Sequence, residues 1–224
     1  RRLCRTVWEF KQRRDNMGIE DLQKNLDEII RDVISPILKQ QGFKKSGRNY
    51  YKGVQHFGLC FNVQTSRHNN ENEVEFTFNT GVIFPEVYKH FYPEMSLSSF
   101  PKEYECVQRT RIGQLLGKPD LWYRLKRGQS IHDISLIVKR DIENYVVPYF
   151  EKFTSDDDIL HMVEIGYRTG APNEDALFAG FCILHGSKAL GEKILKNHYL
   201  SINSKEIYKA RIEKYGAILG VELK

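Results

Sequence analysis

Two segments, FGLCFNVQT at residues 57–65 and VEFTFNTGVIF at residues 74–84, decide the fold. In both, large apolar side chains alternate with small or polar ones, a period of two that is typical of half-buried β-strands. The polar run HNNEN at residues 68–72 separates them, so we expect them to pair as an antiparallel hairpin. The alternation predicts one aromatic face and one polar face.

A helix is expected before the hairpin. From Ile19 to Gln41 apolar residues recur every three or four positions, which gives the segment a single apolar stripe. Gly42 follows as a C-cap, and Pro36 lies inside the stripe, where it is expected to kink the helix.

Two shorter strands, at about residues 105–112 and 121–125, are expected after the hairpin. Ser130 and Asp133 then have the spacing of a capping box, at the start of a helix that runs to about residue 153. The sequence therefore predicts an α+β fold, an antiparallel sheet of four to five strands covered on one face by helices. The expected core contains Leu26, Ile30, Phe57, Phe61, Phe76, Phe78, Ile134 and Val138.

Helical patterns alone occupy the rest of the chain. Ser155 opens one helix, and further helices are expected near residues 173–185, 188–198 and 204–215. The sequence thus predicts three parts: residues 1–16, an α+β domain over residues 17–153, and a helical C-terminal subdomain over residues 154–224.

Residues 1–16, RRLCRTVWEFKQRRDN, differ sharply from the amphipathic pattern that begins after Met17. We interpret them as a non-native leader translated from a ribosome-binding site, so that the native chain would start at Met17. A genuine basic N-terminal arm is the alternative. Without the six basic and two acidic residues of this segment the net charge falls from +5 to +1, which removes most of the attraction to nucleic acid phosphates.

The motifs of several enzyme classes are absent from the sequence. It contains no HExxH metalloprotease helix, no GxSxG nucleophile elbow and no P-loop. The four cysteines, Cys4, Cys60, Cys106 and Cys182, are too widely spread for a CxxC metal site, and we expect reduced, buried thiols. The sequence predicts no catalytic residue and no cofactor.

The run Asp156, Asp157 and Asp158 has two interpretations. Clustered carboxylates suit a hard cation. The three residues also follow Ser155 at the start of a predicted helix, where acidic side chains interact favourably with the helix dipole. We favour the helix-start interpretation and predict no metal site.

Charge and hydropathy restrict the partners. The basic and aromatic segment at residues 42–52 resembles a single-stranded nucleic acid site, but a solvated connection explains it as well, and nucleic acid is not the expected partner. No apolar run approaches the length of a membrane helix, and no secretory signal is present, so we expect a cytoplasmic protein without a membrane partner. The oligomeric state stays open.

The polar face of the sheet is the candidate binding surface. Strand alternation places Asn62 and Gln64 opposite the aromatic face of the first strand, and Asn79 opposite that of the second. Arg109 and Arg111 on the next strand are expected to project to the same side. Guanidinium groups beside amides would suit a carboxylate or phosphate, although a merely solvated sheet face explains the pattern too.

The order of motifs resembles a bacterial family, domain of unknown function 4304. The motifs are GFKKSGRNYYKG from Gly42, FNVQTSR from Phe61, FTFNTGV from Phe76, RTRIG from Arg109 and LWY from Leu121. The most specific of their elements are the Gly-Phe-Lys-Lys run, Gln64 with Ser66, and Asn79 with Gly81. The resemblance covers about residues 19–153 and implies no catalytic residue.

Two functions stay open at this point. The first is a non-enzymatic module that binds another protein, in the manner of an immunity protein, through the polar sheet face. The second is an enzyme or a binder of a small anion, with a site assembled from Asn62, Gln64, Asn79, Arg109 and Arg111. The absence of catalytic motifs favours the first.

Overall fold

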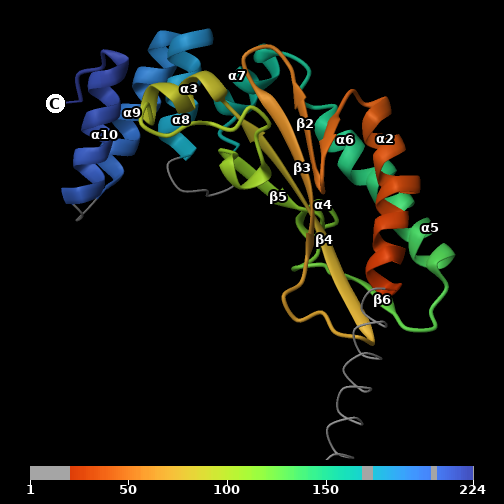
Figure 1. Cartoon of the computed structure of the whole chain (residues 1–224). Helices are drawn as coiled ribbons and strands as arrows, with labels where there is room; N and C mark the ends of the chain where they lie inside the picture. The colour runs from red at the N-terminus through yellow and green to blue at the C-terminus, as the bar shows by residue number, and fades with distance from the viewer. Residues whose placement is uncertain (1–20, 168–173, 203–205, 224) are drawn as a thin grey trace, which may run out of the picture. The chain divides into compact units, whose positions relative to one another are not determined.

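The computed structural model describes residues 21–167, 174–202 and 206–223, which form an α+β fold around a six-stranded sheet (Figure 1). The predicted leader at residues 1–16 lies outside the described residues. The strands are β1 (Lys44–Ser46), β2 (Asn49–Gly53), β3 (Gly58–Thr65), β4 (Glu73–Ile83), β5 (Gln108–Arg111) and β6 (Tyr123–Lys126). Their order is β1-β2-β3-β4-β5, and β6 pairs with β4. The predicted fold class is confirmed, and the very short β1 adds a strand to the expected sheet.

The chain divides into two compact units, and strands β2, β3, β4 and β5 each contribute residues to both. The first unit contains residues 21–50, 62–79 and 111–149, and the second contains residues 51–61, 80–110 and the described residues from 150 onward. A separable helical subdomain at residues 154–224 stays a prediction.

The first unit begins with a helix whose predicted kink is a π turn. Residues 21–29 are helical, η1 (Ile30–Ile34) is the wider π turn, and α2 (Ser35–Gln40) completes the helix. Pro36 has no N–H to continue the helical ladder, and the π turn directly before it accommodates this loss. Gly42, with φ of 86°, ends the helix as predicted.

The aromatic face of the hairpin packs as the sequence predicts. Phe76 and Phe78 are fully buried, and the antiparallel register of β4 and β6 places Phe76 opposite Tyr123. The ring centroids of Phe76 and Tyr123 are 5.3 Å apart, and those of Phe78 and Tyr123 are 4.9 Å apart. All eight residues predicted for the core are buried.

A buried carboxylate joins this aromatic face to the helix that follows the sheet. That helix consists of α5 (Ile131–Asp141), the π turn η3 (Ile142–Val146) and α6 (Val147–Phe150), and α5 packs against η1. The hydroxyl of Tyr123 donates a 2.8 Å hydrogen bond to Asp141, whose other oxygen accepts from Arg140. Burial, followed by this hydrogen bond, raises the pKa of Tyr123.

Two details of the sequence prediction were wrong. The side chain of Ser130 makes no capping hydrogen bond at the start of α5, where Ser130 is exposed and the N–H groups of the first turn are open to solvent instead. The alternative of a merely solvated polar face does not hold for the middle of β4, since Thr77 is fully buried and Asn79 is 3% exposed. Long side chains of neighbouring strands cover a strand in the middle of a sheet. The alternation of the sequence predicts on which face a side chain lies, but not how much of that face is exposed.

The second unit is built around helix α8 (Glu174–His185), which is apolar on most sides. Helix α8 packs against α3 (Pro85–Phe91), α7 (Asp156–Glu164), α9 (Lys188–Ser201) and α10 (Glu206–Leu219). Its Phe181 lies against Phe57 and Phe84. The remaining short helices are η2 (Glu103–Glu105) in the second unit and α4 (Ile112–Leu115) in the first.

Cys60, Cys106 and Cys182 of the second unit are buried and form no disulfide, as predicted. Cys60 and Cys106 form a small apolar cluster with Ile83, against which Tyr51 and Leu97 pack. Burial raises the pKa of the Cys106 thiol well above its usual value, which lowers its reactivity. None of the helices in the described parts of the chain has the length and apolar character that a membrane crossing needs.

We predict that Tyr123→Phe lowers the free energy of unfolding by about 1–3 kcal/mol, because it leaves one oxygen of the buried Asp141 without its hydrogen-bond donor. Urea denaturation measures this change. The matched control is Tyr104→Phe, which alters a tyrosine that is 65% exposed and should leave stability unchanged. Equal stability of the two variants would contradict the assigned role of the Tyr123 hydroxyl.

Candidate functional site

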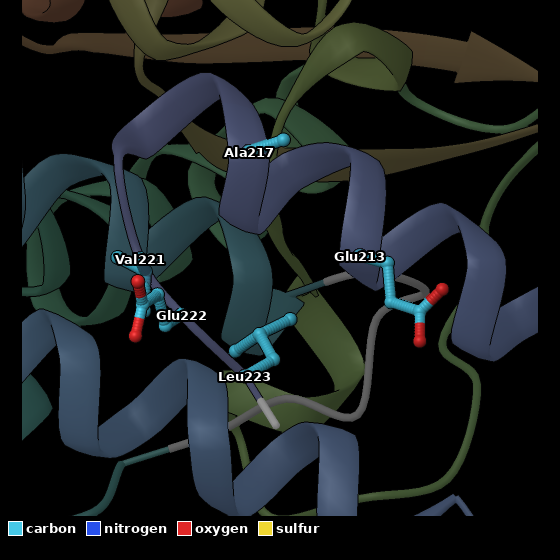
Figure 2. Close-up of a pocket in the computed structure, with 5 residues that line it drawn as sticks. All are labelled: Glu213, Ala217, Val221, Glu222 and Leu223. Carbon is cyan, nitrogen blue, oxygen red and sulfur yellow. The ribbon is translucent and has the colours of Figure 1, made fainter.

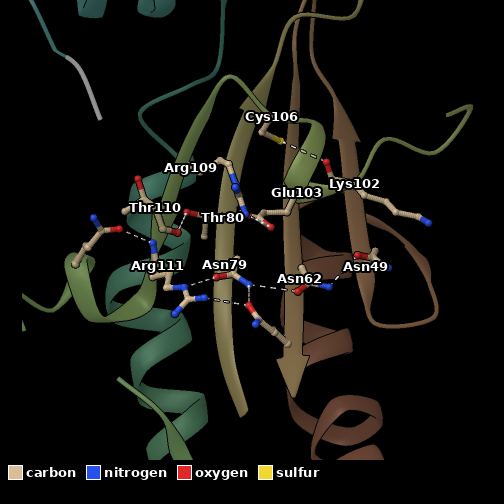
Figure 3. Close-up of polar contacts among 12 residues, drawn as sticks. Asn49, Asn62, Asn79, Thr80, Lys102, Glu103, Cys106, Arg109, Thr110 and Arg111 are labelled. Atoms are coloured by element: carbon tan, nitrogen blue, oxygen red, sulfur yellow. Dashed lines mark hydrogen bonds and ion pairs between the residues drawn. The ribbon is translucent and has the colours of Figure 1, made fainter. Parts of the chain in front are cut away.

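Arg111, the last residue of β5, connects three polar side chains of the first unit, and Figure 3 shows its contact with Asn79. Its Nε donates to Oδ1 of Asn79 at 3.1 Å, and its Nη2 donates to Oε1 of Gln64 at 3.3 Å. Its Nη1 donates to both carboxylate oxygens of Asp120 at 2.8 Å. One guanidinium group is therefore held by two amides and one carboxylate.

The amides continue the network across the sheet. Nδ2 of Asn79 donates to Oε1 of Gln64 at 2.9 Å and to Oδ1 of Asn62 at 3.4 Å. Nδ2 of Asn62 donates in turn to Oδ1 of Asn49 at 2.9 Å. Both ends of the buried Asn79 amide thus have partners, as a buried amide requires. We call Asn49, Asn62, Gln64, Asn79, Arg111 and Asp120 the polar network.

The outer end of the polar network is open to solvent. The side chain of Arg111 is 38% exposed and that of Asp120 is 49% exposed. Nε1 of Trp122 donates to Asp120 at 2.9 Å, and the guanidinium carbon of Arg111 lies 5.7 Å from the centre of the Trp122 ring. The hydrogen bond from Arg111, followed by that from Trp122, lowers the pKa of Asp120. An exposed cation, an exposed anion and an aromatic ring therefore meet at this point.

Arg109 has a different partner. It belongs to the second unit, where its Nε and Nη2 donate to the two carboxylate oxygens of Glu103 at 2.6 and 3.2 Å. The Glu103 side chain is 8% exposed, and its hydrogen bond raises the pKa of Arg109. The structure thus joins Asn62, Gln64, Asn79 and Arg111 by hydrogen bonds, whereas Arg109 pairs with Glu103. Ligand binding by any of the five stays a prediction.

The sequence prediction did not include Asp120 and Trp122. Both lie between α4 and β6, in a connection without the regular periodicity that placed the strand residues. Pro119 before Asp120 indicates a turn, but a turn signal does not tell which strand residue the carboxylate reaches.

A second polar group, in the second unit, was also missed. Oδ2 of Asp156 lies 2.5 Å from Nδ1 of His56, and Oδ1 accepts from the backbone N–H of His56 at 3.2 Å. The ring of His56 stacks on that of His185, with centroids 4.0 Å apart and an interplanar angle of 11°. Nε2 of His185 lies 3.3 Å from Oε2 of Glu86, without the geometry of a hydrogen bond. We call His56, Glu86, Asp156 and His185 the histidine cluster.

The aspartate run at the start of α7 has both a capping role and a role in this cluster. Asp158 accepts hydrogen bonds from the N–H groups and hydroxyls of Thr154 and Ser155, which confirms the predicted function at the helix start. Asp156 instead binds His56, a contact across 100 positions that local spacing does not reveal. Within the described ranges no set of three or more His, Cys, Asp or Glu side chains is arranged to hold a metal ion.

A hollow of about 530 Å³ at the end of α10 is a weaker candidate. Glu213 and Ala217 on α10, and Val221, Glu222 and Leu223 after it, line this hollow. Figure 2 shows the carboxylates of Glu213 and Glu222 at opposite ends, so they do not converge on one point. Glu213 also accepts a 2.8 Å hydrogen bond from Tyr199. We find no convergent chemistry in these lining residues.

Comparison with known families agrees with the resemblance seen in the sequence. A family model described as Domain of unknown function (DUF4304) matches residues 34–152, more than half of the chain. The chain belongs to the DUF4304 family. No curated protein and no solved structure matches it. The DUF4304 region contains the whole polar network, whereas Asp156 and His185 of the histidine cluster lie beyond its end.

We predict that His185 makes the DUF4304 protein less stable in acid. Burial, followed by the charge of His56, lowers the pKa of His185 below the 6.5 of an unperturbed histidine. The folded state therefore binds a proton less readily than the unfolded chain, so the stabilisation is complete above pH 6.5 and is lost as the pH falls through the lowered value.

The variant His185→Phe tests this pH dependence, since phenylalanine retains a ring for stacking but does not titrate. The loss of unfolding free energy between neutral and acidic pH should be smaller in His185→Phe than in the wild type. His68→Phe, at an exposed loop position, is the control and should follow the wild type. An unchanged pH profile in His185→Phe would contradict the assignment.

Proposed function

We propose that the DUF4304 domain is a non-enzymatic binding module, and that its polar network recognises a carboxylate of a partner protein. The observation that carries this proposal is the bonding of Arg111. Two uncharged amide oxygens fix its inner side, and the exposed Asp120 occupies its outer side. Asp120 acts as an internal stand-in for the partner's carboxylate.

Exchange of carboxylates on Arg111 is energetically feasible. An exposed ion pair contributes only about 0–1 kcal/mol, so displacement of Asp120 costs little. Asn79 and Gln64 hold the guanidinium in one orientation, which reduces the conformational entropy lost on binding. Arginine binds carboxylates with two parallel N–H donors, and this geometry gives specificity as well as affinity.

Trp122 adds an apolar contact at the edge of the same surface. Its indole lies beside the guanidinium of Arg111, and its N–H is directed to Asp120. Tryptophan and arginine are, with tyrosine, the residue types most enriched at the energetic centres of protein interfaces. This pair supports a protein partner over a free ion.

A small anion is the second candidate ligand. The same guanidinium and the amides of Asn62, Gln64 and Asn79 suit a free carboxylate or phosphate, whereas Arg109 is paired with Glu103 in the second unit. The choice between the two candidates depends on whether binding needs a peptide or only the ion.

We predict opposite effects for Arg111→Ala and Asp120→Asn on the binding of a labelled oligo-glutamate peptide, followed by fluorescence anisotropy at fixed ionic strength. Arg111→Ala should weaken binding about ten-fold or more, because the charge-assisted pair is lost. Asp120→Asn should strengthen it, because the internal competitor loses its charge. Arg124→Ala is the control, since it removes another exposed, carboxylate-paired guanidinium and should bind as the wild type does.

Citrate provides the comparison for the small-anion candidate. Arg111-dependent thermal stabilisation by citrate, without binding of the peptide, would favour the small-anion function. Wild-type binding by Arg111→Ala, or weaker binding by Asp120→Asn, would contradict the exchange of carboxylates on Arg111.

A further inference from the structure

A pocket of about 340 Å³ adjoins the histidine cluster within the second unit. Tyr51, Phe57 and Pro85 form its apolar wall, and His56, Glu86 and Lys89 contribute polar groups. The residues come from β2, the turn before β3, and α3. Pockets of roughly 300–1,000 Å³, mostly apolar and with a few convergent polar groups, are the usual sites for small molecules.

His56 is held in one orientation at this pocket. Its Nδ1 is bound by Asp156, and one face of its ring is covered by His185. The backbone N–H of Asp156 donates to Oε1 of Gln55 at 2.8 Å, so the segment before β3 and the start of α7 are tied together twice. The His56 side chain is still 52% exposed. With Nδ1 occupied, Nε2 is the ring nitrogen that a ligand can reach.

The pocket is balanced in charge. Glu86 and Lys89 are the carboxylate and the ammonium group that line the pocket, and they have opposite signs, whereas Asp156 is not among the lining residues. Because burial disfavours the charged form of His185, its ring does not neutralise Glu86 at neutral pH. The lining therefore offers hydrogen-bond acceptors, a strong donor and an apolar wall, without a net charge that would favour an ion.

We propose that this pocket binds a small neutral molecule with neighbouring hydroxyl groups, a sugar or a polyol. Nε2 of His56 and the carboxylate of Glu86 accept hydrogen bonds from hydroxyls, and the ammonium group of Lys89 donates to hydroxyl oxygens. The ring of Tyr51 and the edge of Pro85 face the carbon skeleton of the ligand. The proposal is independent of the function proposed for the polar network, since its residues all lie in the second unit.

NMR tests this pocket directly. The full chain, labelled with ¹⁵N, is titrated with D-glucose, D-ribose and myo-inositol, and the ring nitrogens of His56 are followed in a long-range proton–nitrogen correlation spectrum. We expect at least one of these compounds to shift the His56 Nε2 signal saturably. Glu86→Gln and Lys89→Gln should each weaken this binding about ten-fold or more, and both change exposed side chains, so the fold is preserved.

Two controls make the test decisive. His68→Gln alters an exposed histidine outside the second unit and should bind as the wild type does. Inorganic phosphate and acetate serve as comparison ligands. The proposal is overturned if none of the three polyhydroxylated compounds gives a saturable shift, if the shift is unchanged in Glu86→Gln, or if phosphate or acetate shifts the signal and the three compounds do not.

Discussion

The burial of β4 on both of its faces is the constraint on which the rest of the sheet depends. Phe76 and Phe78 satisfy it on one face by packing with the ring of Tyr123. Asn79 lies on the other face with 3% of its surface exposed, where an amide without partners costs about 1–3 kcal/mol. Gln64, Asn62 and Arg111 supply those partners. The polar network is thus required by folding before it serves any ligand.

Arg111 therefore has two roles, one in the buried part of the polar network and one at the protein surface. Its Nε side satisfies a buried amide, and its Nη1 side reaches an exposed carboxylate. The exposed ion pair with Asp120 adds little stability, so a partner can compete for it while the inner hydrogen bonds keep the guanidinium in place. An arginine fixed in this way differs from a surface arginine such as Arg124, whose guanidinium pairs with two glutamates at the sheet surface.

The spacing of apolar residues along the sequence was sufficient to predict the fold. The two-residue alternation at residues 57–65 and 74–84 placed Phe61, Phe76 and Phe78 in the core, and the helical stripe placed Leu26 and Ile30 there. The burial of Asn79 escaped prediction because an asparagine at an alternate position is also typical of a wet sheet face. Asn79 is covered because the long side chain of Arg111 reaches it, and residues 112–122 bring Asp120 to the same guanidinium. A local sequence pattern reveals neither contact.

The candidate sites were predictable only where a strand supplies their residues. Asn62, Gln64, Asn79 and Arg111 follow from strand alternation, and hydrogen bonds join them. Asp120 and Trp122 lie in an irregular connection, and the contact of His56 with Asp156 spans 100 positions. Long-range contacts of this kind arise from helix packing in the second unit. The family match covers the whole polar network but only part of the histidine cluster, because Asp156 and His185 lie beyond residue 152.

A double-mutant cycle between Asn79 and Arg111 tests the central claim that the buried amide holds the guanidinium in place. Asn79→Ala, Arg111→Ala and the double variant are compared with the wild type by urea denaturation. Direct hydrogen bonding predicts that the double variant loses less stability than the sum of the single losses, with a coupling free energy of about 0.5–3 kcal/mol. Losses that add, within the error of the measurement, would contradict the claim.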